Sequence, residues 1–153
     1  LSRRMNKNVK KRMVKALIWS VGLYGCETWI IRAEEKRRID AFEMWLWRKM
    51  ERIKWEDKKT NEEVLEMVDE KRCMRDKILE RKKRWIGHII RGDGLLKDVI
   101  EGKMEGKRGR GRKRISMIGE LTEGDYGKMK RRAEDREEWR HWRPTTCQIT
   151  AEN

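Results

Sequence analysis

The scarcity of aliphatic and phenyl side chains is the feature that most constrains how this chain can fold. Leu, Ile, Val and Phe account for 29 of the 153 residues, whereas 44% of all residues are charged. An apolar share of about 20% combined with high net charge is the level at which chains begin to remain disordered. Eight Trp and nine Met residues offset this shortage, because each buried indole removes a large apolar area from water. We therefore expect a small core anchored by Trp side chains, with frayed ends.

Apolar side chains recur every third or fourth residue through most of the chain, and this spacing predicts helices. Val9, Met13, Leu17 and Val21 form one such stripe, and the clearest pattern runs over residues 34–53. Alternation typical of strands never lasts for more than a few residues. The sequence predicts an all-α fold of several short amphipathic helices, at 5–21, 34–53, 61–69 and 72–91, with weaker helices near 115–121 and 126–139. A shared core is expected from Leu17, Phe42, Leu46, Ile78, Trp85 and Ile89.

Two short motifs have a structural interpretation. Thr60 and Glu63 form a capping box, in which hydroxyl and carboxylate satisfy each other's backbone amides at the start of a helix. Around Trp85, Gly87 is expected to let two helices approach closely while His88 caps or packs. We favour this structural interpretation over a catalytic site at His88.

Trp45 and Trp47 are two residues apart, so they point to different faces of the helix predicted at 34–53. We expect both rings to lie in the core. The alternative is that one ring stacks on a base or on a partner protein.

Positive charge is high and unevenly distributed. Lys and Arg number 41 against 27 Asp and Glu, a formal net charge of +14, which favours a polyanionic partner. Residues 56–70 instead contain seven acids and two bases. The helix predicted at 72–91 is a candidate phosphate track, with a solvated helix face as the alternative. Its basic face consists of Lys71, Arg72, Arg75, Lys77, Arg81, Lys82, Lys83, Arg84 and Arg91, against Asp76 and Glu80.

The run 107–114 alternates glycine with basic residues, which keeps the backbone thin enough for guanidinium groups to follow a phosphate backbone. Arg108-Gly109-Arg110 resembles an AT-hook core, but Gly111 replaces its proline, so general RNA or DNA backbone binding is favoured over sequence preference. A nuclear-localisation signal is an alternative of comparable weight. The candidate nucleic-acid-binding residues are Lys82, Lys83, Arg84, Arg91, Lys107, Arg108, Arg110, Arg112, Lys113 and Arg114.

The three cysteines, Cys26, Cys73 and Cys147, are widely separated and lack a nearby His pair, which excludes a zinc knuckle. We expect inert thiols, no metal and no cofactor. No apolar stretch approaches the ~20 residues that a membrane span needs, and no signal-peptide pattern occurs. An intracellular location, in the nucleus and cytoplasm, is expected.

Five ordered landmarks suggest a family. They are Tyr24-Gly-Cys-Glu-Thr-Trp29, Thr60-Asn-Glu-Glu-Val-Leu65, Arg84-Trp-Ile-Gly-His-Ile-Ile-Arg91, the arginine-glycine run 106–114 and Asp135-Arg-Glu-Glu-Trp-Arg140. Together they resemble the region downstream of the polymerase core in the endonuclease-reverse transcriptase polyproteins of non-long-terminal-repeat retrotransposons. The resemblance covers roughly residues 1–143. Because the chain begins at Leu1 without an initiator Met, we interpret it as a piece of such a polyprotein.

This resemblance implies the thumb and post-thumb region, whose helices grip the primer-template duplex and the element's RNA. Its partners would be RNA or DNA, together with upstream palm and endonuclease domains. The implied segments are a thumb-like segment at 1–55, an RNA-binding-like segment at 56–101, a flexible Gly/Arg-rich loop at 102–114, a C-terminal helical segment at 115–143 and a disordered tail at 144–153.

Polymerase chemistry needs paired aspartates that hold two metal ions. None of the eight Asp residues here are adjacent. The endonuclease of such polyproteins also needs clustered carboxylates with a catalytic His, and the only histidines here are His88 and His141. We therefore expect the chain by itself not to be an enzyme. Two alternatives to a nucleic-acid-binding fragment stay open. One is an independent helical protein-interaction module with a nuclear-localisation signal, and the other is a decayed remnant.

Overall fold

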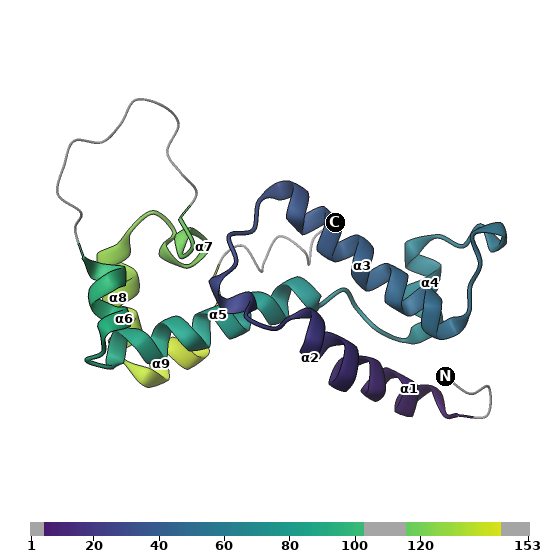
Figure 1. Cartoon of the computed structure of the whole chain (residues 1–153), viewed down its shortest axis with the longest axis horizontal. Helices are drawn as coiled ribbons and strands as arrows, with labels where there is room; N and C mark the ends of the chain where they lie inside the picture. Colours follow the sequence, from purple (N-terminus) through teal and green to yellow (C-terminus); the bar gives the residue numbers. More distant parts are fainter. Residues whose placement is uncertain (1–4, 103–115, 145–153) are drawn as a thin grey trace. The chain divides into compact units, whose positions relative to one another are not determined.

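The computed structural model describes residues 5–102 and 116–144, and Figure 1 shows their helices. No strand occurs in these two ranges, which confirms the all-α fold. None of their helices is long and apolar enough to cross a membrane. The elements are α1 (Lys7–Met13), the π-helical turn η1 (Val14–Ile18), α2 (Trp19–Gly22), the 3₁₀ turn η2 (Cys26–Thr28), α3 (Ala33–Glu51), the 3₁₀ turn η3 (Trp55–Asp57), α4 (Asn61–Val68), α5 (Met74–Arg91), α6 (Leu95–Glu101), α7 (Gly119–Thr122), α8 (Tyr126–Glu134) and α9 (Arg136–His141).

The chain divides into two compact units, and the division falls inside α5. The first unit contains residues 31–78 with the chain before residue 27, and the second contains residues 27–30 with the chain after residue 78. At 1.5 Å per residue, the 18-residue α5 is about 27 Å long, so its two ends contribute to separate hydrophobic clusters.

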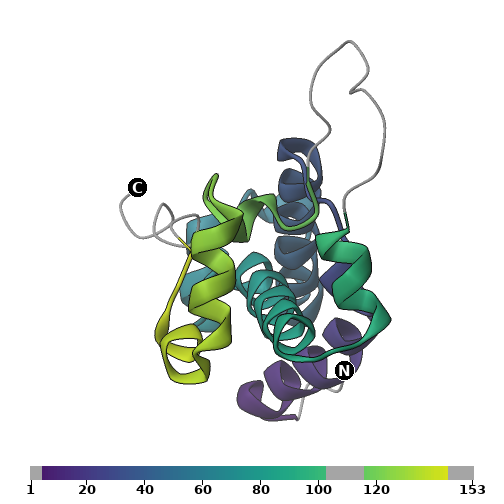
Figure 2. The same cartoon turned by 90° about the vertical axis from the view of Figure 1, so that its left-hand side faces the viewer.

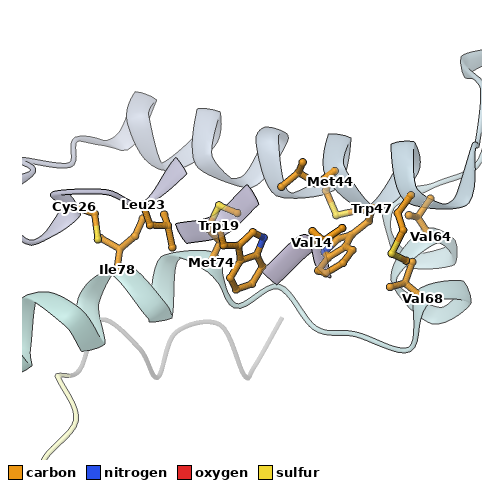
Figure 3. Packing of buried hydrophobic residues seen from close by; sticks show 12 residues of the cluster. Val14, Trp19, Leu23, Cys26, Met44, Trp47, Val64, Val68, Met74 and Ile78 are labelled. Carbon is orange, nitrogen blue, oxygen red and sulfur yellow. The ribbon is translucent and has the colours of Figure 1, made fainter. Parts of the chain in front are cut away.

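The first unit is anchored by two indoles, as Figure 3 shows. The rings of Trp19 and Trp47 lie 6.1 Å apart between centroids, at an interplanar angle of 57°. Trp47 is fully buried, as expected, whereas Trp45 is 55% exposed, so the expectation that both rings lie in the core is wrong for Trp45. The other buried members are Val14, Leu23, Cys26, Met44, Leu46, Met50, Val64, Val68, Met74 and Ile78.

The start of α4 is the capping box that the sequence predicts. The Glu63 N–H donates to Thr60 Oγ1 at 3.2 Å, and the Thr60 N–H donates to Glu63 Oε2 at 2.7 Å. At the other end of α4, Lys7 Nζ donates to the Met67 carbonyl at 2.6 Å and Lys11 Nζ to the Val68 carbonyl at 3.0 Å. These lysines neutralise the partial negative charge at the helix C-terminus, so part of the basic face of α1 has a structural role.

A buried carboxylate holds the start of α5. Glu43 is 1% exposed and accepts N–H bonds from Cys73 at 3.1 Å and Met74 at 3.2 Å. Burial outweighs these bonds and raises the pKa of Glu43 above its ordinary value. Burial also raises the pKa of the Cys73 thiol to about 11, which keeps this sulfur protonated at neutral pH, as expected for an inert thiol.

The second unit packs α8 and α9 against the C-terminal half of α5; in Figure 2 the yellow-green pair and the green α6 flank α5. A Cβ added at Gly87 would lie 2.2 Å from Trp139 Nε1, so the predicted close helix approach at Gly87 is confirmed. Trp139 Nε1 donates to the Lys83 carbonyl at 3.1 Å. The buried cluster contains Leu79, Ile86, Ile90, Leu121, Met129, Ala133 and Trp139.

The expected shared core is wrong in part. Leu46, Ile78 and Ile89 are buried, whereas Leu17 and Phe42 are 59% and 37% exposed. Trp85 is half-buried at the edge of the second cluster, and so it belongs to a different core from Leu46 and Ile78.

The π-helical turn explains the error in the first helix. Its i→i+5 hydrogen bonding places Val14 and Trp19, five residues apart, on the buried side. Val9, Leu17 and Val21, three members of the expected four-residue stripe, are exposed instead.

Asp135 divides the helix predicted near 126–139. Its carboxylate accepts the N–H groups of Glu137 at 2.8 Å and Glu138 at 2.9 Å, so α9 begins there as a separate helix. The weaker helix predicted near 115–121 is observed as α7. The Gly/Arg-rich loop beyond residue 102 and the tail beyond residue 144 lie outside the described residues.

Candidate nucleic-acid interface

A hollow of about 430 Å³ lies between α5 and α9 in the second unit. Five of its seven lining residues are basic and one is acidic. From α5 it is lined by Glu80, Lys83, Arg84 and Arg91, and from α9 by Arg136, Trp139 and Arg140. We call this site the arginine hollow.

Helix periodicity brings the arginines together. Arg84 and Arg91 are seven residues apart on α5, and Arg136 and Arg140 are four apart on α9, so each pair shares a helix face. Between the two pairs, the Trp139 indole packs where Gly87 leaves room. The cluster thus depends on the glycine in α5 and on the Asp135 cap that starts α9.

Lys83 joins the two helices rather than standing free. Its ammonium donates to the Arg140 carbonyl at 3.1 Å and also to the Trp142 carbonyl. The same Nζ lies 5.8 Å from the ring centroids of both Trp139 and Trp142. These contacts fix the C-terminal end of α9, so Lys83 adds positive charge to the hollow mainly as a structural residue.

Arg91 and Arg136 form a pair of like charges. Arg91 Nη1 donates to the Ala133 carbonyl at 2.7 Å. Partial burial, with the nearby charge of Arg136, lowers the pKa of Arg91, although an arginine remains charged at neutral pH. A bound anion would relieve this repulsion.

The remaining arginines are exposed. Arg84 pairs with Glu80 at 3.5 Å, but its side chain is 80% exposed, and such surface pairs contribute little. Within the described residues, no carboxylate pairs with Arg136 or Arg140. Their guanidinium groups therefore keep donors available for an anionic ligand.

Lys82 corrects the sequence-based site. It is 1% exposed, and its Nζ donates to the Trp29 carbonyl at 2.6 Å, so it cannot reach a phosphate on the surface. A signal was present in the spacing, because Lys82 lies four residues after Ile78 and four before Ile86, on the buried stripe of α5. Burial of an ammonium requires a partner, which the Trp29 carbonyl supplies.

The N-terminal half of the predicted track is also engaged elsewhere. Arg75 pairs with Asp40 at 2.8 Å, and Arg72 with Glu62 at 3.7 Å. His88 is exposed and does not line the arginine hollow. The remaining predicted residues, Lys107, Arg108, Arg110, Arg112, Lys113 and Arg114, lie outside the described residues.

The sequence interpretation missed Arg136, Trp139 and Arg140 as site residues, although they lie in the last family landmark. Their four-residue basic spacing on a capped helix was the available signal. Across residues 5–102 and 116–144, no three His, Cys, Asp or Glu side chains cluster as metal ligands would. Comparison with protein-family models, curated proteins and solved structures finds no match of any of these kinds.

Proposed function

We propose that this chain binds RNA or DNA through the phosphate backbone, as a thumb and post-thumb fragment of a retrotransposon reverse transcriptase. The observation that carries the proposal is the arginine hollow, where five basic side chains and one acidic side chain surround the Trp139 indole. Arginine is suited to this ligand because its planar guanidinium donates two parallel hydrogen bonds to a phosphate.

The spacing of the arginines fits a polymer of phosphates. Arg84 and Arg91 are separated by about 10 Å along α5, at 1.5 Å per residue. One strand of a duplex carries a charge about every 3.4 Å of axis, so this separation spans about three phosphates. A nucleic-acid strand can thus contact Arg84 and Arg91 together, which a single small anion cannot do.

In this proposal the chain contributes binding and no catalysis. The paired aspartates and the endonuclease residues would belong to the upstream palm and endonuclease domains of a parent polyprotein. Nucleotide incorporation by the purified chain, with Mg²⁺ and a primed template, would contradict this division of roles.

The experiment compares two double variants of the full chain. Arg136→Gln with Arg140→Gln removes two exposed charges of the hollow, while Lys128→Gln with Arg131→Gln removes two exposed charges of α8 outside it. We expect the first pair to weaken binding of a labelled single-stranded RNA at least about tenfold, because a hydrogen bond to a charged group contributes about 1.5–3 kcal/mol. The α8 pair should change affinity far less. Equal losses in both variants would mean that net charge alone binds RNA, and would refute the site.

A further inference from the structure

A second hollow, in the first unit, has a different chemical character. It has a volume of about 760 Å³, and its floor is formed by Val14, Leu46 and Met50, which are 3%, 3% and 4% exposed. Ile18 and Ile53 form part of its walls. We call it the Trp groove, because two indoles, Trp45 and Trp55, complete it.

The indoles of the Trp groove are unusually open to solvent. Trp55 is 86% exposed and Trp45 is 55% exposed, although this chain has few large apolar side chains for its core. Trp45 stacks on Phe42 with centroids 6.1 Å apart and an interplanar angle of 16°, which holds its ring in place. Exposed, positioned Trp side chains beside a buried apolar floor are typical anchors of a protein interface.

The charged side chains that line the Trp groove are all positive. Lys49, Arg52 and Lys54 are exposed there, and Arg48 is held by Asn61 Oδ1 at 2.8 Å. Among the described residues, no acidic side chain lines the groove. Glu56 and Asp57 follow Trp55 in the chain, and Asp57 accepts the Lys54 N–H at 2.8 Å, but neither lines it. A complementary ligand must therefore be negatively charged around an apolar centre.

The apolar lining distinguishes a peptide from a nucleic acid. Single-stranded nucleic acids bind through aromatic faces on which bases stack. Here five of the seven apolar lining residues are aliphatic, and the Trp45 ring already stacks on Phe42. An aliphatic floor instead accepts leucine, methionine or phenylalanine side chains spaced along one face of a helix.

We propose that the Trp groove binds an acidic amphipathic helix of a partner protein. The apolar face of that helix would lie on Val14, Leu46 and Met50 between the two indoles, and its Asp and Glu side chains would meet Lys49, Arg52 and Lys54. The inference goes beyond nucleic-acid binding and uses no residue of the arginine hollow, so either proposal can fail without the other.

Selection from a displayed library of random 16-residue peptides, with the full chain as bait, tests the ligand chemistry directly. We expect enriched peptides to carry Leu, Met or Phe at i, i+3 or i+4, and i+7, with Asp and Glu between them. Enrichment of basic peptides, or of acidic peptides without an apolar period, would overturn the proposal. The absence of any enrichment would also overturn it.

Variants of the full chain then locate the binding site of a selected peptide. Trp55→Ala should weaken its binding about tenfold or more, whereas Tyr24→Ala, which removes another aromatic ring that is 86% exposed, should leave binding unchanged. Lys49→Gln with Lys54→Gln should weaken binding several-fold more than Arg12→Gln with Arg37→Gln, two exposed basic residues outside the lining. Because the substituted residues are exposed, circular dichroism should confirm unchanged folding.

Two results would reassign the Trp groove. Equal effects of Trp55→Ala and Tyr24→Ala would place the peptide elsewhere. A single-stranded oligouridine probe is then added to the bound peptide. If the probe displaces the peptide from the wild-type chain but not from the Arg136→Gln, Arg140→Gln variant, the competition depends on RNA bound at the arginine hollow, and the Trp groove remains the peptide site. Displacement from both proteins would assign the groove to nucleic acid and overturn the proposal.

Discussion

Lys82 and Lys83 show how adjacent basic residues acquire different roles. Lys82 lies on the buried stripe of α5 and donates to the Trp29 carbonyl, whereas Lys83 donates to carbonyls at the end of α9. The exposed Arg84 follows them. Three consecutive basic residues thus have three roles: Lys82 is a buried cation, Lys83 holds the end of α9, and Arg84 is a surface charge.

Replacing Lys82 by Met should destabilise the protein without changing an RNA contact. The variant keeps the apolar stem but leaves the Trp29 carbonyl without this donor, which costs about 1–3 kcal/mol. Arg84→Gln should lower RNA affinity while changing stability by less than about 0.5 kcal/mol. Urea unfolding with RNA titration checks both. A Lys82→Met variant that is as stable as wild type but binds RNA weakly would show that Lys82 contacts RNA and is not a core residue.

Gly87→Ala should also destabilise the fold, because the new Cβ would lie 2.2 Å from Trp139 Nε1. Overpacking of this kind costs about 1–3 kcal/mol, more than the ~1 kcal/mol that alanine gains over glycine inside a helix. Gly22→Ala is the matched control, since its Cβ would meet Phe42 at an ordinary 3.5 Å. Thermal melting compares the two. Equal melting temperatures for Gly87→Ala and wild type would mean that the helices do not approach closely at Gly87.

At the scale of elements, local signals predicted more than long-range ones. The Thr60–Glu63 capping box and the bounds of α3 and α5 depend on neighbouring residues, so the sequence was sufficient. The π-helical turn was not predictable from the four-residue spacing, because it buries Val14 and Trp19, which are five residues apart. Lys83 and Arg84 were identified as site residues from the local charge of α5. Their partners on α9 were missed, because only the folded structure brings α9 beside α5.

A hydrogen-bonded link between α6 and α8 gives a pH-dependent prediction. Glu101 accepts from Tyr126 at 3.1 Å and pairs with Lys130 at 2.7 Å. Its bond to Lys130 lowers the pKa of Glu101 and raises that of Lys130, while burial and Glu101 raise the pKa of Tyr126 to about 12. The stability that Glu101 contributes to the folded state is lost as pH falls below 4.5, the ordinary pKa of a glutamate, towards the lowered pKa of Glu101. The stability that Tyr126 and Lys130 contribute is lost as pH rises above about 10, where both groups begin to lose their protons in the unfolded chain.

Phenolate absorbance measures this link, because the chain has only two tyrosines. In a Tyr24→Phe variant, we expect Tyr126 to titrate near pH 12 while circular dichroism shows that the helices remain folded. Adding Glu101→Gln should move the titration towards pH 10, because the negative charge that opposes ionisation is gone. A Tyr126 pKa that does not respond to Glu101→Gln would contradict the contact.

At the scale of the whole molecule, the two candidate sites differ in their apolar lining: basic side chains line both, but only the Trp groove has a buried aliphatic floor. The arginine hollow belongs to the second unit and the Trp groove to the first. In the two proposals, phosphate binding and helix docking therefore use different residues. Nucleic-acid binding and protein interaction, which the sequence analysis leaves open as alternatives, are thus compatible as proposals for one chain.

The Gly/Arg-rich loop belongs to the same binding account. Replacing Arg108, Arg110 and Arg112 by Gln should reduce the slope of log affinity against log salt by roughly two to three, at about 0.7–0.9 per phosphate contact. Binding to unrelated sequences should weaken about equally. A triple variant that keeps full affinity for RNA and DNA but no longer accumulates in nuclei would instead identify this loop as a transport signal.

The salt dependence of RNA binding tests the central claim most directly. The wild-type chain and a variant with Arg84→Gln, Arg136→Gln and Arg140→Gln are titrated with a single-stranded RNA over a range of salt concentrations. Since each phosphate contact on a single strand contributes about −0.7 to the slope, the variant should have a slope shallower by about two. Identical slopes, or wild-type binding that does not respond to salt, would contradict phosphate recognition by the arginine hollow.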